Sequence, residues 1–320
     1  MLRKIDKSLL MSVVILVLVL VVFQITTKGN LLTKRNLLNI INQSLTTAIA
    51  GLGLIFVAAM GGTNITAGVV AATAGVIAVT VARTAFALTF PAAMAVGLLF
   101  GLFLGFVNAV FKVPSFMASL AILIAGRAAF VWYVSSRVIF APMDILALNK
   151  LEYKIPILAL LTILIGYILE YTPFGNYVKA IGENENAVKF MGINVRRYKI
   201  WAYALSGIMF GIAGIFLIAR SGGASHTMGT GMEMQVMMAL FIGGVPVQGG
   251  TGTRIFKLLF GAPLIVLLEN GLVLSGTSGP MTQLVKGLAL LAIVYLSVRL
   301  NKVERLREPK EQLASSPGLS

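Results

Sequence analysis

Apolar residues recur along the chain in runs long enough to cross a bilayer, separated by short polar stretches. The runs fall near residues 9–26, 37–60, 66–84, 89–111, 116–136, 155–171, 200–219, 232–247, 255–274 and 284–300. A helix of about 20 apolar residues spans the hydrocarbon core of a membrane. The pattern therefore predicts an all-α polytopic membrane protein of about ten transmembrane helices. The run at 232–247 is short and rich in glycine, so a broken or re-entrant helix is an alternative there.

Composition supports the same class of protein. The chain is 58% hydrophobic and 12% charged, with a mean hydropathy of +0.93, which lies far outside the soluble range. Its 320 residues leave no room for a separate soluble domain, so residues 1–320 are expected to form a single transmembrane domain. The net charge of +15 does not indicate nucleic acid, because the basic residues stand singly at span ends and in the tail. The absence of cysteine excludes a disulfide framework.

Basic residues also predict the orientation. Arg3, Lys4 and Lys7 precede the first apolar run, and no small-residue cleavage site follows it, so this run is interpreted as an uncleaved first span. When the spans alternate from a cytoplasmic N-terminus, the cytoplasmic side collects more Lys and Arg than the other side. Both termini are therefore expected in the cytoplasm, together with a polar stretch at 175–199 and a tail at 301–320.

That polar stretch interrupts the apolar pattern between Phe174 and Lys199, with the sequence GNYVKAIGENENAVKFMGINVRRYK before the next span. Its acids, Glu183 and Glu185, precede its bases, in the order that a helix macrodipole favours. The stretch predicts a short helix outside the membrane that docks a partner. The alternative is a solvated loop that only fixes the topology.

Glycines mark further features. The segment GGTNITAG, Gly61–Gly68, predicts an unwound turn inside an apolar region, where irregular backbone is tolerated if it is buried in protein or lines a cavity. Asn64 and Thr66 then either face a translocation path or cap the next helix. Glycines at intervals of four predict close helix packing, in two sets: Gly97, Gly101 and Gly105, then Gly207 and Gly211.

No motif of catalysis or cofactor binding is found in the sequence. His226 is the only histidine, which excludes paired-histidine zinc sites, and no GxSxG elbow accompanies it. The segment GGTGTR lacks the lysine and the following hydroxyl of a phosphate-binding loop. The chain is therefore predicted not to be an enzyme and not to bind ATP by that route.

Several segments resemble a known family. The run AIGENENAVKFMGINVRRYKIWAYALSGIMFGIAG is similar to the cytoplasmic loop and following helix of the permease subunits of ribose-type monosaccharide importers, a branch of the ATP-binding-cassette transporters. GGTNITAG resembles a family segment that usually reads GGIDLSVG, VPSFMASLAILIAGRA resembles its PxFxxTL helix, and GGVPVQGGTGTR resembles a glycine-rich loop. The resemblance spans most of the chain.

The resemblance implies a ten-helix permease subunit in the bacterial cytoplasmic membrane that imports a ribose-like sugar. The partners that it implies are an ATPase that binds the ATP, a second permease of the same or another kind, an extracytoplasmic substrate-binding protein and the lipid membrane. Residues implied for coupling to the ATPase are Glu183, Glu185, Asn186, Ala187, Gly192 and Arg196. Residues interpreted as lining the translocation path are Asn64, Thr66, Asn108, Phe116 and Glu269.

Two departures from the family pattern leave the substrate open. Asn64 stands where the family usually has Asp, and LENGL, which contains Glu269, replaces the common NNGL. A permease for nucleosides or branched-chain amino acids is an alternative, and an ion-coupled carrier that works alone is an alternative of another class.

Glu269 and Lys286 lie at similar depths in consecutive spans, because one is near the end of its run and the other near the start of the next. An unpaired charge in a bilayer costs several kcal/mol, so we expect a structural ion pair between them. The alternative is that Glu269 binds a substrate hydroxyl.

Overall fold

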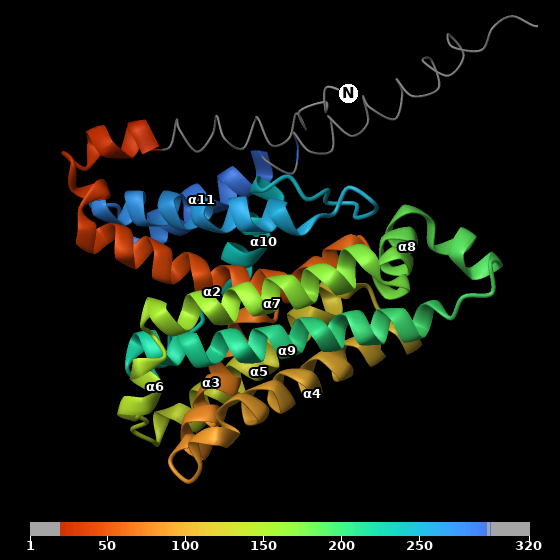
Figure 1. Ribbon diagram of the computed structural model, residues 1–320, viewed down its shortest axis with the longest axis horizontal. Helices are drawn as coiled ribbons and strands as arrows, with labels where there is room; N and C mark the ends of the chain where they lie inside the picture. The colour runs from red at the N-terminus through yellow and green to blue at the C-terminus, as the bar shows by residue number, and fades with distance from the viewer. Residues whose placement is uncertain (1–19, 293–294, 296–320) are drawn as a thin grey trace, which may run out of the picture.

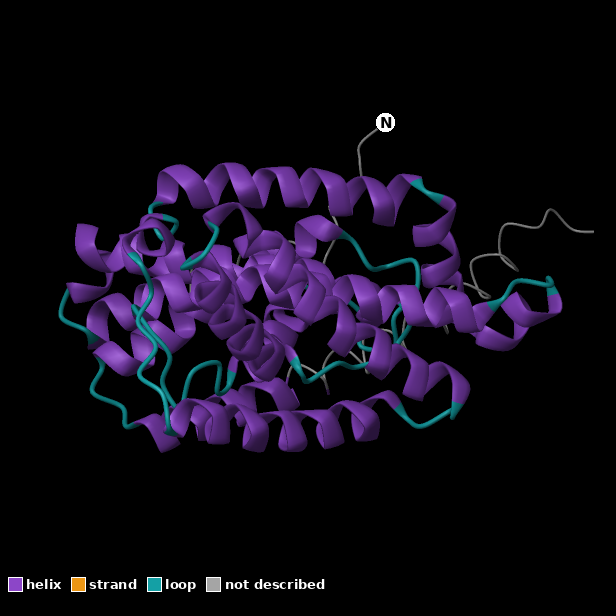
Figure 2. Cartoon of the chain, turned by 90° about the horizontal axis from the view of Figure 1, so that it is seen from below, coloured by secondary structure: helices purple, strands orange, loops and turns teal. Residues whose placement is uncertain are grey.

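The computed structural model describes residues 20–292 and 295, and within them the chain forms helices joined by turns and loops (Figures 1 and 2). The predicted tail at 301–320 and most of the predicted first span lie outside the described residues, as does the end of the last predicted span. The all-α prediction is confirmed for the part of the chain that the structure describes.

Six of the described helices are long and apolar enough to cross a membrane, as expected of a polytopic membrane protein. They are α2 (Lys34–Ala59), α4 (Thr89–Val110, which follows the turn η2 at Phe86–Leu88), α5 (Ser115–Ser135), α7 (Leu151–Tyr171), α9 (Val195–Ser221) and α11 (Ile255–Leu274). The shorter elements are η1 (Asn30–Leu32), α3 (Ala67–Ala82), α6 (Met143–Ala147), α8 (Pro173–Phe190) and α10 (Met232–Ile242). Residues 20–26 and 279–292 are also helical.

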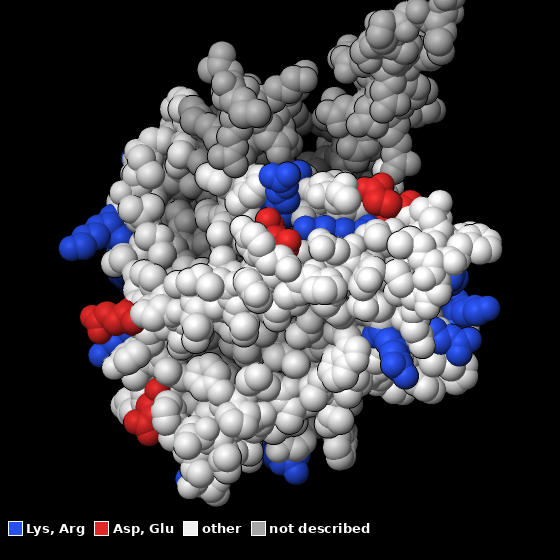
Figure 3. Space-filling view, turned by 45° about the vertical axis from the view of Figure 1, so that its right-hand side comes forward, with Lys and Arg blue, Asp and Glu red and all other residues white. Residues whose placement is uncertain are grey.

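The core forms around α9 and α2. The most apolar stretch of α9 is 83% buried and that of α2 is 78% buried, against 17% for the peripheral α7. A helix that is apolar on all sides can occupy such a central place. Glycines allow the closest approach, because a Cβ on Gly97 of α4 would overlap the backbone of Gly207 in α9. The predicted helix packing through these glycines is confirmed. Charged side chains are sparse over the face seen in Figure 3.

The eighth predicted span is broken. Helix α10 has 11 residues, about 16 Å of rise, whereas a spanning helix must cover about 30 Å. Residues 222–231 before it form bends and turns rather than helix. The broken-helix alternative therefore describes this segment, and a continuous span over 232–247 does not.

One end of the bundle carries α8, which projects at the right in Figure 1, while α6 lies at the opposite end. The loop at 243–254 also lies at the α8 end, because the backbone N–H of Gly250 donates to the carbonyl of Ala59, at the end of α2, over 2.8 Å. This end gathers most of the residues predicted to contact a partner.

Candidate functional site

The predicted helix in the polar stretch is present as α8, and it is divided at Asn184. The backbone there leaves the helical region, with φ −158° and ψ 97°. The Asn184 Oδ1 accepts hydrogen bonds from the backbone N–H groups of Asn186 and Ala187, each over 3.1 Å. Asn184 thus caps a second short helix, residues 185–190, because its side chain satisfies amides that have no partner within the helix. We call residues 185–194 the α8 tip.

Local contacts fix the α8 tip on the bundle. Val188 packs with Ile181 and Val195 in a small apolar cluster separate from the main core. The chain then reverses at Gly192, whose φ of +77° favours glycine. A glycine in this conformation just after a helix is a common way for the helix to end.

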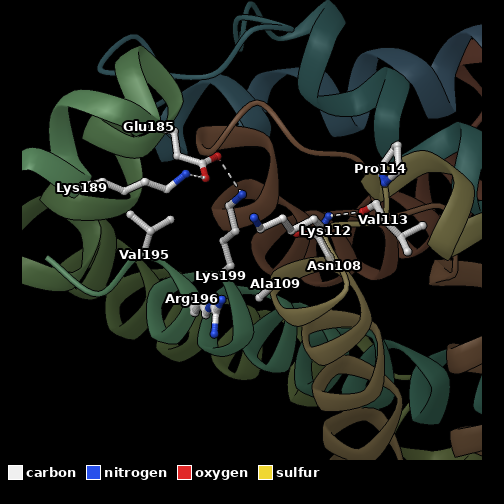
Figure 4. A pocket seen from close by; sticks show the side chains of 10 residues that line it. All are labelled: Asn108, Ala109, Lys112, Val113, Pro114, Glu185, Lys189, Val195, Arg196 and Lys199. Atoms are coloured by element: carbon white, nitrogen blue, oxygen red, sulfur yellow. Dashed lines mark hydrogen bonds and ion pairs between the residues drawn. The ribbon is translucent and has the colours of Figure 1, made fainter.

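Glu185 makes two ion pairs, one within the α8 tip and one that links the tip to α9. Its carboxylate lies 2.6 Å from Lys189 Nζ and 2.7 Å from Lys199 Nζ. Partial burial tends to raise the pKa of Glu185, but the hydrogen bonds and positive charges of the two lysines outweigh this effect and lower the pKa. Glu185 is therefore ionised at neutral pH and holds both lysines in place (Figure 4).

These side chains border a basic hollow of about 380 Å³ between the ends of α4 and α9 (Figure 4). Four of its lining residues are basic and one is acidic: Lys112, Lys189, Arg196, Lys199 and Glu185. Lys112 and Arg196 make no ion pair within the part of the chain that the structure describes. The hollow therefore has a net positive charge and can accept a carboxylate from another protein.

Two apolar side chains stand next to this charged surface. Phe190 is 92% exposed and Met191 is 71% exposed at the α8 tip. Apolar side chains exposed among polar ones mark contact sites, and aromatic residues and Met are enriched at protein interfaces. Phe190 and Met191 were not among the candidate residues taken from the sequence. Two adjacent apolar residues inside the polar stretch at 175–199 could have indicated a contact site.

Comparison with known proteins places the sequence of this chain in a family. The family model described as "Branched-chain amino acid transport system / permease component" matches residues 36–294. The chain belongs to this family. The resemblance noted in the sequence is thus confirmed, and a permease component is not an enzyme, as the sequence predicts.

Several curated relatives align along most of this permease. It is 30% identical to the ribose import permease protein RbsC of Escherichia coli (strain K12), over 88% of this chain and 91% of that protein. It is 31% identical to RbsC of Haemophilus influenzae, over 81% and 84%. It is 30% identical to the fructose import permease protein FrcC of Rhizobium meliloti, over 91% and 85%. No solved structure matched the chain.

Glu183, which precedes the tip, contacts the permease's own glycine-rich loop. Its Oε1 accepts hydrogen bonds from the backbone N–H of Thr251 over 2.9 Å and from the Thr251 hydroxyl over 3.0 Å. The neighbouring Gly250 donates to Ala59 at the end of α2. Two adjacent residues of the loop at 243–254 therefore bond to α8 and to α2, so the loop connects the two helices.

The residues interpreted as lining a path do not form one cluster in the permease. Asn64 and Thr66 are buried, and Asn64 Oδ1 accepts hydrogen bonds from the backbone N–H of Thr66 over 3.1 Å and from its hydroxyl over 2.7 Å. Asn64 Nδ2 donates to Ser206 over 3.1 Å. These bonds hold Asn64 and Thr66 to each other and Asn64 to α9, and no side-chain hydrogen bond caps α3 at Thr66.

The other three residues of that set lie in different places. Asn108 borders the basic hollow, and its Nδ2 donates to the carbonyl of Val113 over 2.8 Å. Phe116, in the first turn of α5, is 49% exposed. Glu269 lies far along α11 from the α8 end and is bonded to Lys286.

Proposed function

We propose that this chain is the membrane-spanning subunit of an ATP-driven importer that takes up a monosaccharide delivered by an extracytoplasmic binding protein. The family supports a permease component, and the ribose and fructose import permeases among its relatives support a sugar as substrate. The observation that carries the proposal is the α8 tip, because it exposes Phe190 and Met191 beside a basic hollow, as a docking surface for another protein would.

In this proposal the permease has about ten spans in a bacterial cytoplasmic membrane. Six described helices are long and apolar enough to span, and the four other predicted runs each contain helical residues within the described part of the chain, which supports that number. The run at 232–247 then crosses as a broken helix. Both termini and the α8 end are cytoplasmic, with residues 1–320 as one transmembrane domain, 175–199 as its coupling loop and 301–320 as its tail. A second permease, either an identical copy or an unlike subunit, completes the membrane part.

The α8 tip docks in a groove of the ATPase. Asn186, Ala187 and Gly192 meet the groove together with the exposed apolar pair, and Arg196 and Lys112 meet acidic side chains at its rim. Glu185 does not contact the ATPase itself; it keeps Lys189 and Lys199 in place through its two ion pairs. Glu183 transmits the movement of the docked helix to the loop at 243–254, and through that loop to α2.

Along the path itself, Phe116 contacts the substrate from the exposed side of α5. Asn64 and Thr66 keep the unwound segment Gly61–Gly68 in shape at the inner end of the path, and Asn108 stabilises the turn that follows α4. Glu269 supports the opposite end through its ion pair with Lys286.

Purification in mild detergent and reconstitution test the proposal. We expect an ATPase and a binding protein to copurify with the chain. Liposomes containing the complex should accumulate ribose or fructose only with ATP, and neither a nucleoside nor leucine. Uptake that an ion gradient sustains without any ATPase would instead identify a carrier. Uptake of leucine or a nucleoside in place of the sugars would reassign the substrate.

A further inference from the structure

The segment 222–231, before α10, enters the interior of the bundle without helical structure. At its start the backbone N–H of Ala141 donates to the carbonyl of Gly222 over 3.0 Å, close to α6 and far from the α8 end. Farther along, Arg127 Nη1 donates to the carbonyl of Met228 over 2.7 Å. Arg127 lies near the middle of α5, so the segment reaches about half the depth of the bundle by Met228.

This segment carries an exposed polar surface at that depth. Thr227 and Thr230 are exposed, as are Ser225 and His226 before them. Irregular backbone and polar side chains are not found against lipid tails, because no water is there to hydrogen-bond them. By contrast, α7 exposes apolar side chains near its middle, such as Ile163 at 71%. The face of 222–231 is therefore not a lipid-facing surface.

The first turn of α10 adds buried polar atoms without partners. Glu233 Oε1 accepts a hydrogen bond from the backbone N–H of Gly231 over 3.2 Å, whereas its Oε2 is buried and has no hydrogen-bond partner among the described residues. Gln235 is 8% exposed, and its Nε2 likewise has no partner among them. A carboxylate oxygen left unpaired at this depth is costly, so such groups mark places where water or a ligand supplies the partner.

We propose that the segment 222–231 and the first turn of α10 line a water-filled translocation path, in which Glu233 accepts a hydrogen bond from a hydroxyl group of the substrate. A neutral polyhydroxyl compound fits this acceptor, because each hydroxyl can donate to the carboxylate without bringing a second charge into the membrane. Arg127 holds the segment at its depth through the carbonyl of Met228. The choice of a sugar rests on the proposed function, whereas the water-filled path rests on the geometry alone.

Labelling of single cysteines tests the path independently of transport. The chain has no cysteine, so Thr230→Cys and Ile163→Cys each give it a single labelling site, and labelling of this chain is measured in the assembled complex in native membranes. Ile163 is the matched control, since it lies near the middle of α7 as Arg127 does in α5. We expect a membrane-impermeant maleimide to label Thr230→Cys at least tenfold faster than Ile163→Cys. Equal rates, or an unreactive Thr230→Cys, would overturn the path and indicate burial against another subunit.

Uptake of labelled ribose tests the role of Glu233. Glu233→Gln keeps an oxygen that can accept from Gly231 but removes the charge, and Glu152→Gln removes a charge from the exposed first turn of α7 as a control. At equal amounts of assembled complex, we expect at least a tenfold loss of uptake for the first and none for the second. Wild-type uptake by Glu233→Gln would overturn its role. If the wild-type complex transports no sugar, the proposed substrate fails, while the labelling still decides the path.

Discussion

Lys286 Nζ donates a hydrogen bond to Glu269 Oε1 over 3.0 Å, which joins the helix at 279–292 to α11. The lysine is 1% exposed, so its charge is almost entirely removed from water. The ion pair expected from the sequence is confirmed. Glu269 keeps 25% of its side chain exposed, so the larger penalty falls on the lysine, whose charge is left buried and uncompensated when Glu269 is removed.

A double-mutant cycle on this pair is the first prediction. Glu269→Gln and Lys286→Met should each lower the free energy of unfolding by about 3 kcal/mol, as measured in detergent, and the double variant should lose less than the sum. Strictly additive losses, with Glu269→Gln abolishing substrate binding, would contradict the structural role and favour a substrate contact.

Gly192 gives a test of the α8 tip. Its φ is +77°, and a Cβ added there would meet no atom within 4 Å, so Gly192→Leu brings backbone strain of about 1–2 kcal/mol and an exposed side chain without an internal clash. Gly222 has the same φ and the same free space at the opposite end of α9. We expect Gly192→Leu to abolish ATPase copurification and Gly222→Leu to retain it. Equal retention by both variants would show that the α8 tip is not the docking surface.

The exposed apolar pair at the tip should carry much of the binding. Replacing Phe190 and Met191 by serine is expected to weaken ATPase binding at least tenfold, because buried aromatic anchors contribute most at interfaces. Folding should be unaffected, since both side chains lie outside the core. Met143→Ser, at the first residue of α6, which is 81% exposed, is the control and should bind normally. Undiminished binding by the double variant would place the contact elsewhere.

Glu183 should matter for coupling rather than for assembly. Glu183→Ala removes the acceptor for both Thr251 hydrogen bonds, so ATP hydrolysis should continue while uptake per ATP falls at least fivefold. Thr251→Val removes the hydroxyl but keeps the backbone N–H, and a smaller fall is expected. The measurement is the ratio of uptake to hydrolysis in proteoliposomes. If hydrolysis and uptake fall in proportion, Glu183 serves assembly instead.

The two ion pairs of Glu185 predict a pH dependence of stability. Because the folded protein lowers the pKa of Glu185, the unfolded chain binds a proton more readily, and the stabilisation is present above the ordinary pKa of 4.5. It is lost as the pH falls through the lowered pKa. Wild type should therefore melt at a higher temperature than Glu185→Gln. This difference should be constant above about pH 5.5 and should shrink below about pH 4.5. A difference that grows on acidification would contradict this sign.

The sequence by itself determined the class of protein and the places of its helices. Span length and apolar composition are local properties that a bilayer selects directly, so the predicted runs other than 232–247 agree with the described helices to within about five residues. Depth along consecutive spans was enough to pair Glu269 with Lys286, since the two residues are close in the chain.

Only the tertiary structure decided which polar groups share a site. Glu183 was expected to face a partner, yet its carboxylate bonds to Thr251, on a loop that comes much later in the chain. The polar segment 222–231 is short and ordinary in composition, and its importance comes from the depth that Arg127 and the neighbouring helices impose on it. A hydropathy pattern records how much each residue avoids water, whereas the partner of a hydrogen bond depends on which distant segments the packed helices bring together.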